Sequence, residues 1–297
     1  MSDPMIEIHG LRKRFGKQQV LDGVDLSVPQ GSIFGFLGLN GAGKTTTISI
    51  LLGLMKADEG SCSVAGVDPV KDAVEVRRRI GYMAENQTMY GWMRVQEIID
   101  WCGGFYPTWD RAFALELCKQ MSLAADAKVG TLSKGQSSKL SLLLALAHRP
   151  KLVILDDPAL GLDPLARRDF LRDVIGQLQA RDVTVFFSSH LLYEIEPICD
   201  YVAILHQGKI VACDTVDVLR ERVRRVELQS KDIGGLRDVP TLLDVRVEGD
   251  RAFATVADFG AARESLERLS RNGSPDTGLN LDEIFEAYVA GRKEFAA

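Results

Sequence analysis

Glycine, lysine and hydroxyl residues are concentrated between positions 38 and 46, in the order Gly-Leu-Asn-Gly-Ala-Gly-Lys-Thr-Thr. Gly38, Gly41 and Gly43 are predicted to adopt positive φ angles that turn consecutive N–H groups toward an anion. Lys44 can reach the β- and γ-phosphates of a nucleotide, and the Thr45 hydroxyl can coordinate Mg2+. The apolar run 33–37 predicts a buried strand before the loop, and 46–52 predicts a helix after it. We therefore predict a nucleoside triphosphate site rather than a glycine-rich turn, with the binding residues Asn40, Gly41, Gly43, Lys44, Thr45 and Thr46.

Two carboxylates, Asp156 and Asp157, follow the apolar run 151–155 directly. Ligands of open α/β sheets gather at the carboxyl ends of such strands. We expect Asp156 to share with Thr45 the Mg2+ that neutralises charge on a transferred phosphoryl group. The alternative is an ordinary pair of aspartates in a turn at the end of a strand.

A third segment, 131–140, places a Ser-x-Gly-Gln turn directly before a predicted helix. The N–H groups of that helix start, together with the Ser133 hydroxyl, could hold a phosphate. A serine at a helix N-cap is ordinary, so this segment indicates little by itself.

In this order the three segments resemble those of the ATP-binding subunit of an ABC transporter, and the match extends over about residues 5 to 220, closest to exporter-type subunits. The resemblance implies a P-loop NTPase core with ATP and Mg2+ as cofactors. It implies that Ser133, Gly135 and Gln136, in the signature 132–136, bind the γ-phosphate of ATP held by the opposite protomer.

Three further residues receive roles from the same resemblance. Phe15 matches the aromatic residue that stacks on adenine, and a core phenylalanine is the alternative. Asp163, in the segment 161–164, matches the loop that links the two nucleotide sites across the dimer. His190, after the run 187–189, lies where the switch histidine of the family contacts the γ-phosphate.

The chain departs from the family pattern at three positions. Glu85 stands where a Gln usually contacts Mg2+, and a carboxylate remains a good Mg2+ ligand. Lys134 replaces the first Gly of the signature pair, and it could point away from the nucleotide or add a cation near the γ-phosphate. Asp157 replaces the Glu that normally follows the Walker B Asp, the base that orients the attacking water.

The change to Asp157 is predicted to slow hydrolysis without abolishing it. Aspartate is one methylene shorter than glutamate, which withdraws the carboxylate by about 1.5 Å, one C–C bond length. A general base needs contact at about 2.6–3.2 Å or through one water. The predicted catalytic residues are therefore Asp157, His190 and Lys44, and the predicted metal ligands are Thr45, Glu85 and Asp156.

Composition limits the remaining possibilities. The chain has 297 residues, 46% of them hydrophobic, and a net charge of −5, so no nucleic-acid partner is expected from a general basic field. The five cysteines form no Cys-x-x-Cys pair that would indicate a zinc site or a disulfide framework. No secretory signal is expected at 1–4, and no apolar run reaches the roughly eighteen residues of a membrane span. We expect a cytoplasmic subunit, peripheral on the inner face of the cell membrane through a permease.

The element pattern predicts an α/β fold with a small α+β appendage. Segments 5–30 indicate an antiparallel β layer, whereas the continuous apolar runs 151–155, 183–187 and 201–205 are typical of parallel strands. We predict an ATP-binding domain at 5–221, with a helical subdomain at about 88–150, and an accessory domain at 222–297. The accessory domain should contain strands at 224–228, 243–247 and 251–257, and helices at 261–269 and 284–289, the second opened by a capping box at 280–283.

Aromatic residues gather between the Glu85 segment and the signature: Trp92, Trp101, Trp109, Phe105 and Tyr106. In the family this interval is the helical subdomain, whose groove receives a short helix of the membrane subunit. The rings either anchor that helix or form the small core of the subdomain.

Three functions remain open at this point. The first is a transport ATPase that closes head to tail, as a homodimer or as a heterodimer with a second ATP-binding subunit, to drive an integral membrane permease, with export as the direction. The alternative is a slowly hydrolysing ATP-gated dimerisation switch or regulatory module. A soluble ABC ATPase of translation or DNA maintenance is disfavoured, because neither a second such domain nor a coiled-coil or zinc-bearing insertion is visible.

Overall fold

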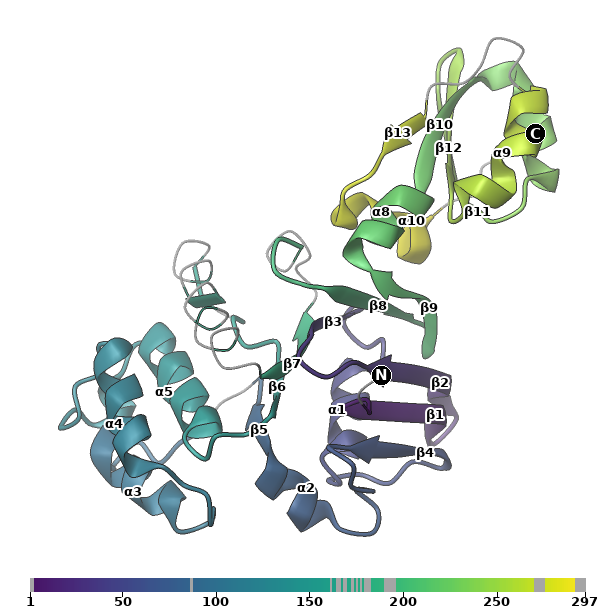
Figure 1. The fold of residues 1–297 in the computed structure, drawn as a ribbon. Coiled ribbons are helices and arrows are strands. Elements are labelled where there is room, and N and C mark those ends of the chain that lie inside the picture. The colour runs from purple at the N-terminus through teal and green to yellow at the C-terminus, as the bar shows by residue number, and fades with distance from the viewer. Residues whose placement is uncertain are drawn as a thin grey trace.

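The computed structural model describes residues 3–85, 88–160, 183–189, 196–269 and 276–291, together with isolated positions between 162 and 178. Within these residues, two sheets and a group of helices form the N-terminal part, and a further sheet forms the C-terminal part (Figure 1). None of the helices in the described segments is long and apolar enough to cross a membrane.

The central sheet has the strand order β5-β6-β7-β3-β8-β9. Its first five strands in this order run parallel, and β9 returns antiparallel to β8. Every residue of β3, β6 and β7 is buried, as expected for strands covered on both faces. The three predicted parallel strands are thereby confirmed as β6, β7 and β8. The bounds are β3 (Ile33–Leu37), β5 (Ile80–Met83), β6 (Leu152–Asp156), β7 (Thr184–Ser189), β8 (Tyr201–His206) and β9 (Lys209–Thr215).

An antiparallel layer of three strands, in the order β2-β1-β4, confirms the predicted β layer. It shares one hydrophobic cluster with helix α1 and with one face of the central sheet. Figure 1 shows α1 between this layer and the central sheet. The bounds are β1 (Ile6–Phe15), β2 (Gln18–Val28), α1 (Lys44–Leu51) and β4 (Glu59–Val64).

Helices α3, α4 and α5 form a group beside β5 (Figure 1). They contribute to a second hydrophobic cluster, which covers the other face of the central sheet. Each of α4 and α5 begins at a side-chain cap, Asp110 and Ser133 respectively, and α2 begins at Asp72 in the same way. The bounds are α2 (Ala73–Arg79), α3 (Val95–Gly103), α4 (Arg111–Gln120), η1 (Val129–Thr131) and α5 (Lys134–Leu146).

The C-terminal sheet is antiparallel, in the order β11-β12-β10-β13, and has its own hydrophobic cluster with η2 and α9. The predicted strands and helices are confirmed, including the capping box between Asn280 and Glu283. Helix α8, the 3-10 segment η2 and strand β13 were not predicted. The bounds are α8 (Val216–Arg222), β10 (Arg224–Gln229), η2 (Ser230–Asp238), β11 (Leu242–Glu248), β12 (Arg251–Val256), α9 (Phe259–Leu269), β13 (Asp276–Gly278) and α10 (Leu281–Ala290).

Helix α10 packs away from the cluster of the C-terminal sheet. Its buried residues Leu281, Ile284 and Phe285 belong to the same hydrophobic cluster as strand β6 and helix α5. Figure 1 shows α10 beside α8, between the C-terminal sheet and the central sheet. The last described helix therefore completes the core of the N-terminal part.

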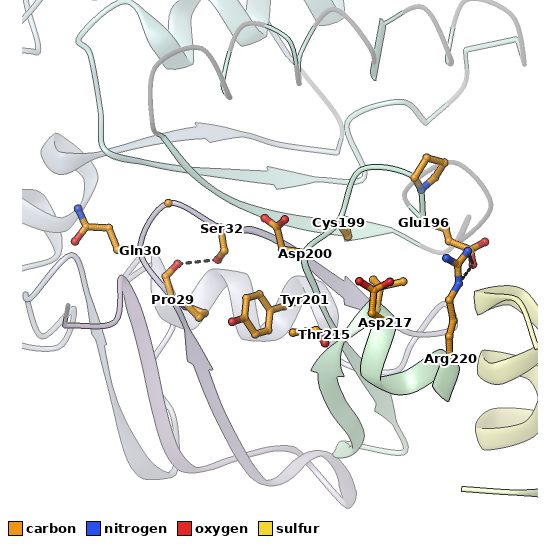
Figure 2. Close-up of a pocket in the computed structure, with 13 residues that line it drawn as sticks. Pro29, Gln30, Ser32, Glu196, Cys199, Asp200, Tyr201, Thr215, Asp217 and Arg220 are labelled. Carbon is orange, nitrogen blue, oxygen red and sulfur yellow. Dashed lines mark hydrogen bonds and ion pairs between the residues drawn. The ribbon is translucent and has the colours of Figure 1, made fainter. Parts of the chain in front are cut away.

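Glu196, which Figure 2 shows joined to Arg220 by a dashed line, lies at the junction where α10 begins. There a pocket of about 810 Å³ lies beside the amino ends of β3 and β8 and the start of α8. The Glu196 carboxylate accepts hydrogen bonds from the Leu281 N–H (2.9 Å) and from Arg220 Nε (3.0 Å). The Asp200 carboxylate accepts the Ile33 N–H at 2.8 Å. Glu196 and Asp200 thus tie the start of α10 and the start of β3 to this junction.

Candidate nucleotide-binding site

In the loop between β3 and α1, two of the three glycines predicted to have positive φ angles have them. Gly41 and Gly43 have φ angles of +81° and +114°. The prediction for Gly38 was wrong, because its φ is not positive. A Cβ at Gly38 would lie 2.7 Å from the Leu205 carbonyl oxygen, so glycine is required there for the close approach of β8.

Helix α1 presents an uncapped start to this loop. Its N-cap is Gly43, no side chain caps it, and its first turn holds no acidic residue. The first N–H groups of a helix have no partner within the helix and carry partial positive charge. This helix start is therefore suited to an anion such as a phosphate.

Lys44 opens α1 and is buried. Its Nζ donates to the Gly38 carbonyl at 2.7 Å and to the Leu39 carbonyl at 3.3 Å. Burial lowers the pKa of Lys44, while the charges of Asp157 and Asp156 act in the opposite direction. A cation at a helix N-terminus is disfavoured by the helix dipole, so its position here fits a site for negative charge.

A pocket of about 520 Å³ lies over this helix start, with the ends of β5 and β6 at its side. It brings together the residues predicted from the loop with the three acidic residues predicted nearby. They are Asn40, Gly41, Gly43, Lys44, Thr45, Thr46, Glu85, Asp156 and Asp157.

Asp156 and Asp157 are both buried in the pocket wall. Asp156 is only 2% exposed, and burial raises the pKa of its carboxyl group, whereas hydrogen bonds from Ser188 and Thr45 lower it. Asp157 has a φ of +44°, a left-handed conformation that aspartate tolerates better than most residues.

The residues present fit a Mg2+ ion that accompanies a nucleotide. The Thr45 hydroxyl bonds to the Asp156 carboxylate, and Glu85 adds a further oxygen donor to the same pocket. Mg2+ is usually held by one or two carboxylates together with phosphate oxygens and water, not by a cage of protein ligands. In the described part of the chain, no cluster of three or more His, Cys, Asp or Glu side chains is suited to a metal.

Phe15 lies at the edge of the site. Its ring is 47% exposed, so the alternative of a core phenylalanine was wrong. Phe15 does not line the pocket, but its pairing partner Gln18 does, together with Val20. Sequence reasoning missed Gln18, Val20 and Leu160 as lining residues, because none of them has a side chain typical of phosphate chemistry.

The signature residues do not line the pocket either. Ser133 is the N-cap of α5, and its side chain forms a capping box with Gln136. Gly135 lies in the first turn of the same helix, and Asp163 is exposed. His190, predicted as catalytic, lies outside the described residues.

The aromatic residues of the helical segment differ in burial. Trp92 is 74% exposed, and Trp101 and Phe105 are also exposed and pack edge-to-face on each other. Tyr106 instead stacks on the ring of His148 with centroids 4.1 Å apart, and Trp109 packs against the hydrophobic cluster. The core interpretation is confirmed for Trp109, and Tyr106 is half-buried against His148, whereas docking of a partner on the exposed rings stays a prediction.

Comparisons with known proteins agree with this geometry. A family model described as ABC transporter matches residues 21–160. The chain is 36% identical over 231 residues to the bacitracin transport ATP-binding protein BcrA of Bacillus licheniformis, covering 77% of this chain and 76% of that protein. It is 31% identical over 291 residues to the Nod factor export ATP-binding protein I of Burkholderia lata, covering 94% and 95%.

Among solved structures, the ATP-binding subunit of an ABC transporter is similar with a TM-score of 0.66 at 30% identity. The similarity covers 73% of this chain and 92% of that chain. The predicted fold class, a mostly parallel sheet with an antiparallel β layer, is thereby confirmed.

Proposed function

Because this chain belongs to the family of ABC transporter ATP-binding proteins, we propose that it hydrolyses ATP to drive a separate integral membrane permease, with export as the direction of transport. The pocket over the uncapped start of α1 is the observation that carries the ATP-binding part of this proposal. The names of the two relatives, one a transport and one an export ATP-binding protein, support the transport part. The subunit would then be cytoplasmic and peripheral on the membrane through its permease.

Five side chains of the pocket receive roles in this proposal. Lys44 and the N–H groups at the start of α1 hold the β- and γ-phosphates. Bound Mg2+ supplies charge neutralisation on the transferred phosphoryl group, and Thr45, Asp156 and Glu85 would hold it. Asp157 orients the attacking water and accepts its proton.

A second protomer completes the site. Ser133, Gly135 and Gln136 lie at the start of α5 and do not line the pocket of their own chain. In the proposed head-to-tail dimer these residues bind the γ-phosphate of the partner's ATP. The partner is a second copy of this chain or a related ATP-binding subunit.

The rate of hydrolysis is expected to be low, because Asp157 has a shorter side chain than the usual Glu. The alternative function, an ATP-gated dimerisation switch, rests on this residue alone, and no contact in the described residues favours it further.

Dimerisation and turnover measured on the same protein test the proposal. We expect sedimentation to show an ATP-dependent dimer, and phosphate release to show steady turnover that increases when the membrane permease that co-purifies with this chain is added. Dimerisation without turnover, even with that partner, would support the switch. A protein that does not bind ATP would contradict both functions.

The exposed aromatic rings predict where the permease docks. Replacing Trp92 and Trp101 with alanine should reduce co-purification with the membrane protein by about tenfold or more, since large aromatic residues often dominate such interfaces. ATP affinity should stay unchanged, because neither ring lines the nucleotide pocket. Val247→Ala, which alters an exposed apolar side chain of β11, serves as the control. Equal co-purification of the double variant and the control would contradict this docking site.

A further inference from the structure

Ser188, on strand β7, lies directly behind the two acidic residues of the pocket. Its side chain is fully buried, and its backbone pairs in parallel register with Asp156 on β6. The carbonyl oxygen of Ser188 accepts the Asp157 N–H at 3.1 Å. Ser188 does not line the nucleotide pocket, and the sequence gives no signal for a role beyond a position in a buried strand.

The hydroxyl of Ser188 connects both carboxylate residues. Ser188 Oγ lies 2.6 Å from Asp156 Oδ1 and 3.2 Å from the Asp157 backbone nitrogen. A backbone N–H can only donate, so at Asp157 the hydroxyl oxygen is the acceptor. The hydroxyl proton is therefore free to be donated to the carboxylate of Asp156, and one hydroxyl satisfies both contacts at once.

The contact to Asp156 orients a side chain, whereas the contact to Asp157 supports the backbone. The bond to Asp156 holds one oxygen of a buried carboxylate, which orients the side chain. The bond from the Asp157 N–H, shared between the carbonyl oxygen and the hydroxyl of Ser188, supports a backbone that has the left-handed φ of +44°. Thr45 also bonds to Asp156, but Thr45 is exposed at the pocket and is itself an expected metal ligand, so Ser188 is the buried support.

We propose that Ser188 is a positioning residue, which orients Asp156 and the Asp157 backbone and thereby sets how tightly the site binds Mg2+ with ATP. This inference rests on the proposed function, since it requires that the pocket holds a Mg2+-nucleotide. Groups that orient metal ligands typically change metal affinity by about 10- to 100-fold when they are removed.

The test compares full-length wild type with Ser188→Ala, Ser188→Thr and Thr184→Val. A fluorescent ATP analogue is titrated onto each protein, once with Mg2+ and once with EDTA. In Ser188→Ala we expect the gain in affinity that Mg2+ provides to fall by about tenfold or more, with affinity in EDTA unchanged. Ser188→Thr keeps the hydroxyl and should retain most of the gain.

Thr184→Val is the matched control. Thr184 is equally buried on the same strand, and its hydroxyl accepts the Gly31 N–H at 2.8 Å, far along the strand from the carboxylates. Its removal should leave the Mg2+ effect unchanged, although it removes a buried hydrogen bond.

An unchanged Mg2+ effect in Ser188→Ala would overturn the proposal. The proposal would also be overturned if Ser188→Thr had the same melting temperature as wild type but lost as much of the Mg2+-dependent gain in ATP affinity as Ser188→Ala. If Ser188→Ala does not fold, Ser188→Cys, which is close in size but a weaker donor, takes its place with a smaller expected loss. A wild-type protein that binds no ATP analogue under either condition would contradict the proposed function itself.

Discussion

Replacing Lys44 with methionine should reduce the rate of ATP hydrolysis by about 100- to 1,000-fold, the range observed when one preorganised charge-stabilising group is removed from an active site. Methionine keeps much of the length of the side chain but removes its charge. The buried Asp156 and its neighbours Asp157 and Glu85 would then face the phosphates without the cation that lies among them. Binding of the fluorescent ATP analogue and phosphate release should both fall.

Lys119→Met provides the control for this change. Lys119 is exposed on α4 and does not line the pocket, so its loss should leave both measurements unchanged. Circular dichroism verifies that each variant is folded. A folded Lys44→Met protein with normal nucleotide affinity would show that the pocket over α1 does not hold the phosphates.

Replacing Asp157 with glutamate should raise turnover by about tenfold or more, as part of the roughly 10²- to 10⁴-fold that a well-placed general base contributes. The backbone of residue 157 is held by Ser188, so the added methylene extends the carboxylate rather than moving the chain. Phosphate release from the protein with its membrane partner measures the change.

Asp157→Asn keeps the length of the side chain and removes its charge, so it should be slower than wild type. Asp157→Glu thus tests whether the position of the carboxylate limits the rate, and Asp157→Asn tests whether a carboxylate is needed at all. If the glutamate variant is no faster than wild type, the shortened side chain does not limit the rate.

The parts of the site that the sequence predicts correctly are those encoded within a few neighbouring residues. Gly41 and Gly43 adopt positive φ because the loop turns into α1 there, and Asn280 caps α10 through a pattern complete within four positions. Similarly, the continuous apolar run before Asp156 is enough to place that residue at the end of a buried strand.

The features that the sequence did not predict depend on contacts between distant segments. Gly38 must be glycine because β8 passes close to it. The residues around Gly38 in the sequence do not indicate that β8 is its neighbour. Ser188 acquires its contacts only when β7 pairs with β6. Gln18 and Val20 reach the pocket because the antiparallel layer folds over α1, which their own residue types do not indicate.

The aromatic residues of the helical segment also show that burial cannot be predicted from residue type alone. Trp101 and Trp109 are close in sequence and equal in type, yet one is exposed beside Phe105 and the other packs against the core. Composition therefore predicted an aromatic-rich region, while only the packing of α3 and α4 could show which rings are left for a partner.

The position of α10 has a consequence for the synthesis of the protein. Leu281, Ile284 and Phe285 fill a hydrophobic cluster whose other buried members, apart from Leu279, all precede the C-terminal sheet, and Glu196 holds the start of their helix. While the chain is being made, that cluster keeps an uncovered apolar surface until the whole C-terminal sheet has been translated and α10 has left the ribosome. Newly made subunits thus pass through a stage in which the nucleotide loop already exists but the core on the opposite face of the central sheet is unfinished, and the docking of α10 ends that stage.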